Sequence, residues 1–304
     1  MKAIIVGMGV QGKKRKKFLG KDFIFAVDKF TKADFKSIYE VPLDKFDTAF
    51  ICVPDHEKFK IVNYCIKNKK NILVEKPFLV KKNKILINLE KYAQKQKIVC
   101  YTAYNHRFEP LITKMKELIK SNKLGKIYKC RIFYGNGTSL LVKKSKWRDK
   151  EMGVLTDIGS HLLDICLFWF GTKIKLLKVV EINKFENKAP DQVTILLEIN
   201  KIKIELEMTL CMWKNTFTCD LIASKGSAHL DSLCKWSKST FCYRKRKFPS
   251  AKPHEKIISV KQGDPTWKRE YLFFKSLIKN KTKASFKKDL ILNNCFHRLN
   301  KSLV

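Results

Sequence analysis

Several features common in proteins of this size are missing from the sequence, and each absence narrows its class. The ten cysteines include no C-x-x-C pair and none closer than eight positions, which excludes a zinc-finger pattern and favours reduced thiols. No apolar run reaches the roughly 18 residues of a membrane span. The opening "MKAIIVGMG" is typical of a first strand entering a glycine turn, not of a cleaved leader. We therefore expect a globular, cytoplasmic protein whose first strand opens the chain, with no cleaved leader before it.

Acidic residues and arginine are both scarce. Asp and Glu number 28 against 64 Lys and Arg, which gives a net charge of +36, yet only eight of the basic residues are arginine. A strongly basic chain attracts phosphate, which keeps a nucleic-acid-associated protein as an alternative. The lysines are spread over nearly every segment, with tighter clusters only at "KKRKK" (13–17) and "RKRK" (244–247). This spread predicts solvated surface lysines and no specific nucleic-acid partner.

The first hundred residues alternate between strand-like and helix-like segments. This alternation predicts a doubly wound parallel sheet, with ligands outside the carboxyl ends of the strands. The stretch 29–47 is too short for a full helix plus strand, so one crossover is expected to be abbreviated. The expected strands are 2–6, 23–27, 48–53, 71–77 and 98–104, and the expected helices are a lysine-rich segment running from the glycine turn up to "FLG" (18–20), 56–68 and a segment ending near 96.

The turn "GMGVQG" after the first strand has the spacing of a dinucleotide-binding fingerprint. Gly7 would allow the tight turn, Gly9 would let the backbone reach a pyrophosphate, and Gly12 would let helix and strand pack closely. Asp28 ends the second strand, 21 residues after Gly7, where a carboxylate can accept the ribose hydroxyl protons of NAD. The carboxylate favours NAD over NADP, although Lys29 beside it keeps NADP as an alternative.

The segment "GVLTDIGSHLLD" (153–164) carries three ionisable groups inside an apolar run. Asp157, His161 and Asp164 stand at i, i+4 and i+7, which predicts one shared face of a helix. Such a face could hold a metal ion. Because no further ligand cluster exists and a lysine would oppose a cation, we expect no metal. Asp164 is expected to brace a neighbouring helix.

Six motifs follow one another along the chain: "EKP" (75–77), "YNHRFEP" (104–110), "LGKI" (124–127), "WR" (147–148), "GVLTDIGSHLLD" (153–164) and "ASKGSAHLD" (223–231). In order and spacing they resemble the glucose-fructose oxidoreductase, inositol dehydrogenase and MocA family. The resemblance implies an N-terminal Rossmann domain (1–106) and a C-terminal α+β domain (107–304) with an open, mostly antiparallel sheet, whose last helix is free to pack back on the first domain. The strand-like runs after residue 107 fit this fold.

The resemblance also implies catalytic roles for three residues. His161 would be the general acid/base, Asp157 would hydrogen-bond the substrate, and Lys76 would stabilise charge on the oxygen being oxidised. We also expect an unusual backbone at Lys76, and a cis bond to Pro77 is the hypothesis. Asp55 and Lys58 depart from the family pattern, which more often shows asparagine and a second histidine there.

Further residues are expected to bind the cofactor or the substrate. The expected cofactor-binding residues are Gly7, Gly9, Val10, Gln11, Gly12, Asp28, Pro54, His56, Glu75 and Lys76. The expected substrate-binding residues are Tyr104, Asn105, Arg107, Arg148 and Asp157.

The sequence therefore predicts an NAD(H)-dependent oxidoreductase acting on a secondary alcohol or ketone of a sugar-like substrate. A nucleotide sugar of surface glycan synthesis is preferred because a basic chain attracts a diphosphate. A homodimer or homotetramer is expected. The alternatives are a non-catalytic, cofactor-sensing regulator of the same family and the basic nucleic-acid-associated protein.

Overall fold

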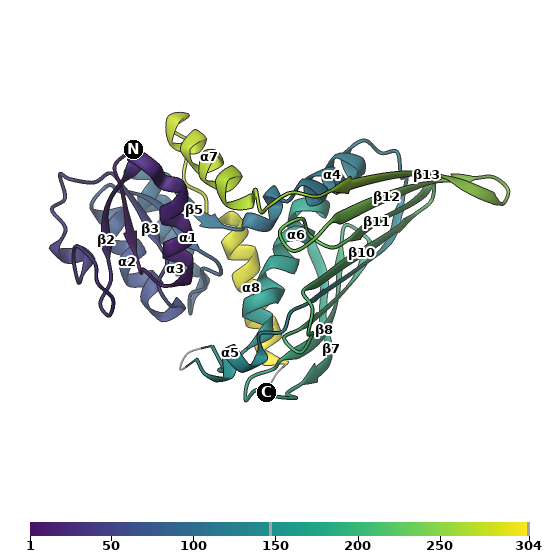
Figure 1. The fold of residues 1–304 in the computed structure, drawn as a ribbon, viewed down its shortest axis with the longest axis horizontal. Helices are drawn as coiled ribbons and strands as arrows, with labels where there is room; N and C mark the ends of the chain where they lie inside the picture. The colour runs from purple at the N-terminus through teal and green to yellow at the C-terminus, as the bar shows by residue number, and fades with distance from the viewer. Residues whose placement is uncertain (146–147, 303–304) are drawn as a thin grey trace. The chain divides into compact units, whose positions relative to one another are not determined.

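The computed structural model describes residues 1–145 and 148–302, which form two compact units. The first unit comprises Met1–Asn105 with Thr266–Asn294, and the second comprises His106–Pro265 with the chain from Cys295 onward. Within the described residues, no helix has both the length and the apolar character needed to cross a membrane. Each unit carries one sheet and its own layer of helices (Figure 1).

The first unit is built on a five-stranded parallel sheet in the order β2-β1-β3-β4-β5, as the alternation predicted. The stretch 29–47 holds only a short 3₁₀ turn, Ile38–Glu40, so this crossover is abbreviated as expected. The elements are β1 (Ala3–Val6), α1 (Val10–Leu19), β2 (Phe23–Val27), β3 (Thr48–Ile51), α2 (Asp55–Lys67), β4 (Asn71–Glu75), α3 (Asn83–Lys95), β5 (Cys100–Ala103), α7 (Thr266–Lys279) and α8 (Lys287–Lys301), the last of which runs on into the second unit.

Both faces of this sheet are buried, because successive strand residues point to opposite sides. Ile4 and Val6 pack with α2 and α3, whereas Ala3 and Ile5 lie in the core that α7 completes. Phe274 of α7 packs edge-to-face on Phe50 of β3, with ring centroids 5.5 Å apart. This packing explains why Thr266–Asn294 belongs to the first unit, whereas the sequence placed 107–304 in the second domain and left only the last helix free to pack back on the first.

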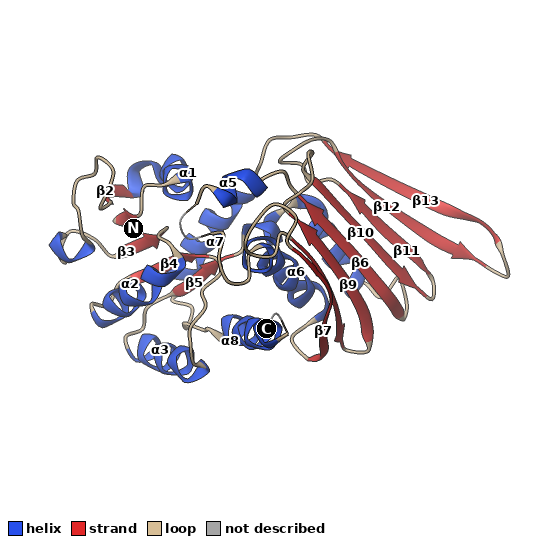
Figure 2. Ribbon diagram, turned by 90° about the horizontal axis from the view of Figure 1, so that it is seen from below, coloured by secondary structure: helices blue, strands red, loops and turns tan. Residues whose placement is uncertain are grey.

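The second unit is an open eight-stranded sheet in the order β13-β12-β11-β10-β6-β9-β8-β7. All neighbours are antiparallel except β6 and β9, which confirms the predicted mostly antiparallel sheet (Figure 2). The strands are β6 (Ile127–Gly135), β7 (Ile174–Asn183), β8 (Gln192–Ile199), β9 (Ile202–Thr209), β10 (Thr216–Ala223), β11 (Gly226–Asp231), β12 (Ser239–Lys247) and β13 (Ala251–Val260). The hairpin of β12 and β13 was not predicted, because "RKRK" was interpreted only as a charge cluster.

Helices cover one face of this sheet (Figure 1). Trp169 of α6 donates from Nε1 to the carbonyl of Ile112 in α4 at 2.9 Å, which ties the two helices together. The segment Leu155–Gly159 before α6 is a π-helix turn, so the predicted helix over 153–164 forms with one wider turn inside it. The helices are α4 (Pro110–Lys120), α5 (Ser139–Lys143) and α6 (Ser160–Phe170), with a 3₁₀ turn at Asn105–Phe108.

Candidate active site

The glycine turn after β1 has the geometry of a phosphate-binding loop. A Cβ on Gly12 would lie 1.9 Å from the Gly7 carbonyl oxygen, so only glycine lets α1 pack on the turn. A Cβ on Gly9 would meet nothing within 4 Å, because Gly9 faces open space. Gly9 is the N-cap of α1, and Val10 and Gln11 in the first helical turn are exposed. The N–H groups of that turn are therefore oriented for an anion, and the turn fits a pyrophosphate.

Asp28 follows β2 and is fixed by backbone donors. Its Oδ2 accepts from the N–H of Met8 at 2.6 Å, and its Oδ1 accepts from the N–H groups of Phe30 and Thr31 at 2.8 Å each. Partial burial acts to raise the pKa of Asp28, but these N–H groups outweigh it, so the pKa lies below its ordinary value. The carboxylate is therefore negatively charged beside the glycine turn, as a ribose-binding group requires.

Glu75 and Arg15 form an ion pair that the sequence analysis did not anticipate. Arg15 Nε lies 2.7 Å from Glu75 Oε1, and its Nη1 lies 2.7 Å from Glu270 Oε2 of α7. Burial opposes the charge of Arg15, but the two carboxylates outweigh it and raise the Arg15 pKa. Arg15 of the "KKRKK" cluster is thus buried and paired with Glu75 and Glu270, unlike the solvated surface charge predicted for that cluster.

The other predicted residues of the first unit differ in exposure. Lys76 is half-buried, and its bond to Pro77 is cis, which confirms that hypothesis. Pro54 is the N-cap of α2, and the His56 side chain is exposed. Tyr104 is 2% exposed and belongs to the packed interior. Asn105 donates from Nδ2 to Thr266 Oγ1 at 2.9 Å. Tyr104 and Asn105, both predicted to bind substrate, therefore each interact with other residues of the protein.

In the second unit, the three ionisable residues of "GVLTDIGSHLLD" have different surroundings. Asp164 is buried and accepts two hydrogen bonds from the Arg107 guanidinium, one of them 2.6 Å from Nε to Oδ2. Asp157 and His161 are both partly buried. The segment Leu155–Gly159, which includes Asp157, is a π-turn, so the spacing between Asp157 and His161 departs from that of an ideal α-helix. Arg107, predicted to bind substrate, forms an ion pair with Asp164.

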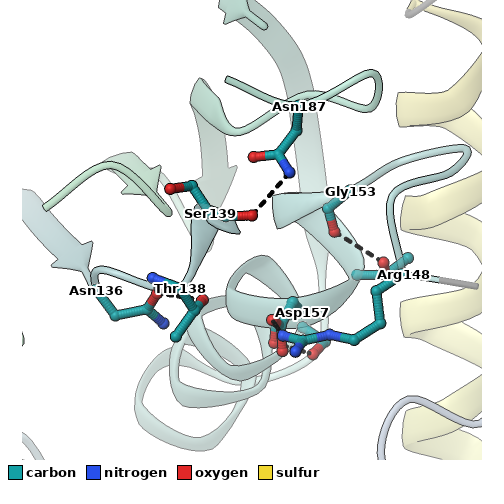
Figure 3. A network of polar contacts seen from close by, with 9 residues as sticks. Asn136, Thr138, Ser139, Arg148, Gly153, Asp157 and Asn187 are labelled. Atoms are coloured by element: carbon teal, nitrogen blue, oxygen red, sulfur yellow. Dashed lines mark hydrogen bonds and ion pairs between the residues drawn. The ribbon is translucent and has the colours of Figure 1, made fainter. Parts of the chain in front are cut away.

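Arg148 and Asp157 form a second ion pair (Figure 3). Arg148 Nη2 lies 2.5 Å from Asp157 Oδ2, and both side chains are about one-third exposed. A guanidinium at this position opposes a metal cation. Among residues 1–145 and 148–302, no three His, Cys, Asp or Glu side chains are grouped to hold a metal. Trp147, the other half of the "WR" motif, lies outside the described residues.

The sequence analysis did not anticipate a ring contact between His106 and His161. His106 is 4% exposed, and its ring centroid lies 3.8 Å from that of His161, with the two ring planes inclined at 46°. Lys235 Nζ lies 3.1 Å from His106 Nε2. Because an ammonium only donates, His106 Nε2 accepts and its proton resides on Nδ1. His106 adjoins Arg107 in "YNHRF", a usable signal, whereas Lys235 is one lysine among many and gave none.

Tyr134 of β6 completes this cluster. Its ring lies 5.8 Å from that of His106 and 5.3 Å from that of Trp236. Burial, together with the negative charge of Asp157, raises the Tyr134 pKa. The second unit thus carries the His161 imidazole, the Asp157 carboxylate and the Arg148 guanidinium. An imidazole can exchange a proton with a substrate hydroxyl group, and the carboxylate can orient that group by a hydrogen bond.

Comparison with known proteins assigns the family. Residues 2–104 match the model described as the oxidoreductase family with an NAD-binding Rossmann fold, and residues 112–229 match the model of the GFO/IDH/MocA C-terminal domain. The chain belongs to the GFO/IDH/MocA family. An uncharacterized oxidoreductase of Schizosaccharomyces pombe is 30% identical over 128 residues, which cover 40% of this chain and 33% of that protein. The chain thus matches about a third of the length of this curated relative.

Solved structures share the GFO/IDH/MocA fold over the whole chain. A levoglucosan dehydrogenase in complex with NADH has a TM-score of 0.82 at 15% identity, covering 99% of this chain and 96% of that chain. A UDP-N-acetylglucosamine 3-dehydrogenase from Acidithiobacillus ferrooxidans has a TM-score of 0.79 at 14% identity, with the same two coverages of 99% and 96%. At these identities the likeness establishes the fold.

Proposed function

We propose that this chain is an NAD(H)-dependent oxidoreductase acting on a secondary alcohol or ketone of a sugar-like substrate. The observation that carries the proposal is the open turn at Gly9 beside the charged Asp28. The first N–H groups of α1 would bind the pyrophosphate, and Asp28 would bind the ribose hydroxyls. When bound, the nicotinamide would supply the acceptor or donor of hydride.

The chain's own residues would handle the proton and the charge on oxygen. The His161 imidazole takes the proton of the substrate hydroxyl during oxidation and returns it during reduction. Asp157 accepts a hydrogen bond from the substrate and orients it, and Arg148 holds Asp157 in place. The Lys76 ammonium stabilises the negative charge that develops on the reacting oxygen.

NAD is the proposed cofactor, with NADP as the alternative. A 2′-phosphate would be repelled by the Asp28 carboxylate, which has a lowered pKa and is therefore charged at neutral pH. Lys29 could offset this repulsion, but its Nζ lies 3.5 Å from Glu57 Oε1. That carboxylate reduces the positive charge available to a 2′-phosphate.

A nucleotide sugar is the preferred substrate class. The net charge of +36 would attract a diphosphate, and the Acidithiobacillus structure of the same fold is named for a UDP-sugar. The structure named for levoglucosan keeps free sugars as an alternative.

Two substitutions test the catalytic assignment, one in each unit. His161→Asn and Lys76→Met should each lower kcat by at least about a hundredfold, the size expected for a lost acid/base or charge-stabilising group. NADH affinity, measured by fluorescence titration, should change by less than about threefold for His161→Asn. Wild-type protein that binds NADH tightly but turns over no sugar would instead indicate a cofactor-sensing regulator.

A further inference from the structure

Lys58 of α2 is a buried charged residue that contacts the backbone of Lys76. Its side chain is 3% exposed, and its Nζ makes three contacts: Asp55 Oδ1 at 2.6 Å, the Pro77 carbonyl at 2.8 Å and the Lys76 carbonyl at 3.2 Å. An ammonium has three N–H donors, so each has its own acceptor. A buried lysine satisfied in this way is part of the structure, not a solvated surface charge.

The two carbonyls belong to successive residues, Lys76 and Pro77. Charged donors make stronger hydrogen bonds than neutral ones, so Lys58 fixes both peptide groups. On the preceding residue, Glu75 is held by the buried Arg15 at 2.7 Å. The backbone that carries Lys76 is therefore held on both sides by a buried cation, one from α1 and one from α2.

The departure of "VPDHEK" from the family pattern gains a physical reason from these contacts. A neutral histidine at position 58 would offer one ring N–H, which cannot serve three acceptors. Asp55 is 43% exposed and begins α2, so it supplies the counter-charge without being buried itself. Burial lowers the Lys58 pKa and the Asp55 carboxylate opposes this shift, which makes the aspartate the natural companion of the lysine.

We propose that Lys58 is a positioning residue that holds the Lys76–Pro77 backbone through its three hydrogen bonds and so orients the Lys76 ammonium toward the substrate. This inference rests on the proposed function, because it takes Lys76 as the group that stabilises charge on the substrate oxygen. It adds a residue that would touch neither substrate nor cofactor.

The test compares Lys58→Met with Lys60→Met, which removes an exposed lysine from the same helix. Lys58→Met should lower kcat between about tenfold and a hundredfold, as small displacements of a reacting group do, with the substrate KM within about threefold of wild type. Lys60→Met should leave kcat, KM and NADH affinity unchanged. A kcat for folded Lys58→Met within about twofold of wild type would overturn the proposal.

A second readout needs neither cofactor nor turnover. In cofactor-free protein, mass spectrometry follows the rate at which an amine-acylating reagent labels Lys76, with the exposed Lys81 as the internal reference. The Lys76 rate should change by at least about threefold in Lys58→Met and stay constant in Lys60→Met. An unchanged Lys76 rate would refute the positioning role. If wild-type protein turns over no substrate, the proposed function fails while this labelling still decides the role of Lys58.

Lys58→Gln keeps the experiment decisive if Lys58→Met does not fold. Glutamine retains two N–H donors without charge, so it should serve part of the acceptor set. We expect an intermediate loss of kcat and an intermediate change in Lys76 labelling. Wild-type values of both in Lys58→Gln would contradict the requirement for a three-donor ammonium.

Discussion

The Asp28 carboxylate accepts backbone hydrogen bonds from both of its neighbouring loops. The Met8 donor lies in the glycine turn, and the Phe30 and Thr31 donors lie just after β2. The residue thus couples the position of the turn to a fixed negative charge. Cofactor choice should depend on this one side chain more than on the many lysines around it.

Replacing Asp28 with alanine should therefore weaken NADH binding and reduce the preference for NADH over NADPH. A charged hydrogen bond contributes about 1.5–3 kcal/mol, so we expect about a tenfold to hundredfold loss of NADH affinity in a fluorescence titration. Asp34→Asn is the matched control, because Asp34 also accepts a backbone bond, from Ala26 at 2.7 Å, but has no proposed cofactor role. Equal NADH affinities in wild type and Asp28→Ala would refute the assignment.

The lowered pKa of Asp28 also sets a pH dependence. The charged form persists at and above the ordinary aspartate pKa of about 3.9 and is lost only as the pH falls through the lower folded value. The contribution of Asp28 to NADH affinity should thus be flat between about pH 5 and 8.

Residues that act through their neighbours in sequence were the ones that could be predicted. Gly7, Gly9, Gly12 and Asp28 have a fixed spacing that reports on one turn. Lys58 was noted only as a departure from the family pattern, and Lys235 gave no signal, because the Lys76 and Pro77 carbonyls and the His106 ring lie 18 or more positions away from these two lysines in the chain. The contact between the His106 and His161 rings likewise depends on tertiary packing.

At the scale of elements, two glycines at the junction of β1 and α1 have different roles, one in folding and one in binding. Gly12 faces the Gly7 carbonyl oxygen, whereas Gly9 faces open space. The same methyl group therefore has opposite consequences at two positions three residues apart.

Gly12→Ala should destabilise the first unit, and Gly9→Ala should not. The clash at Gly12 is with backbone, so a loss of about 1–3 kcal/mol or more in the free energy of unfolding is expected, against less than about 1 kcal/mol at Gly9. Gly9→Ala should instead weaken NADH binding about tenfold or more, or ~1.4 kcal/mol. Urea denaturation and NADH titration measure the two effects. An unaffected NADH affinity in Gly9→Ala would contradict the phosphate-binding role.

The helix at 153–164 shows what a periodicity argument misses. Its apolar spacing predicted a helix correctly, but not the π-turn at Leu155–Gly159. That turn packs against β9, where a Cβ on Gly159 would lie 2.9 Å from Met208 Sδ. Sequence spacing alone carries no information on that contact.

At the scale of the whole molecule, arginines of both basic clusters are paired with glutamates of the protein itself. Within "KKRKK", Arg15 is buried, and within "RKRK", Arg244 Nε lies 2.6 Å from Glu255 Oε1 on the neighbouring strand. Any affinity for nucleic acid should therefore fall steeply with salt and ignore NADH. The homodimer or homotetramer stays a prediction, for which light scattering is the test.

The fold class was predicted at this scale, whereas the division of the chain was predicted only in part, because the last helix alone was left free to pack on the first domain. The parallel sheet followed from the alternation of strands and helices, and the mostly antiparallel sheet was implied by the family resemblance. The placement of Thr266–Asn294 with the first unit depends on Phe274 and Glu270 meeting the sheet and Arg15, contacts between segments far apart in the chain.

The most direct test is the absorbance of reduced nicotinamide over a panel of nucleotide sugars, free sugars and inositols, with NAD and NADP in parallel. The account predicts turnover of at least one sugar-like substrate, faster with NAD than with NADP. Tight NADH binding without turnover on any panel member, under conditions where the protein is folded, would contradict the central claim that this chain is a sugar-directed oxidoreductase.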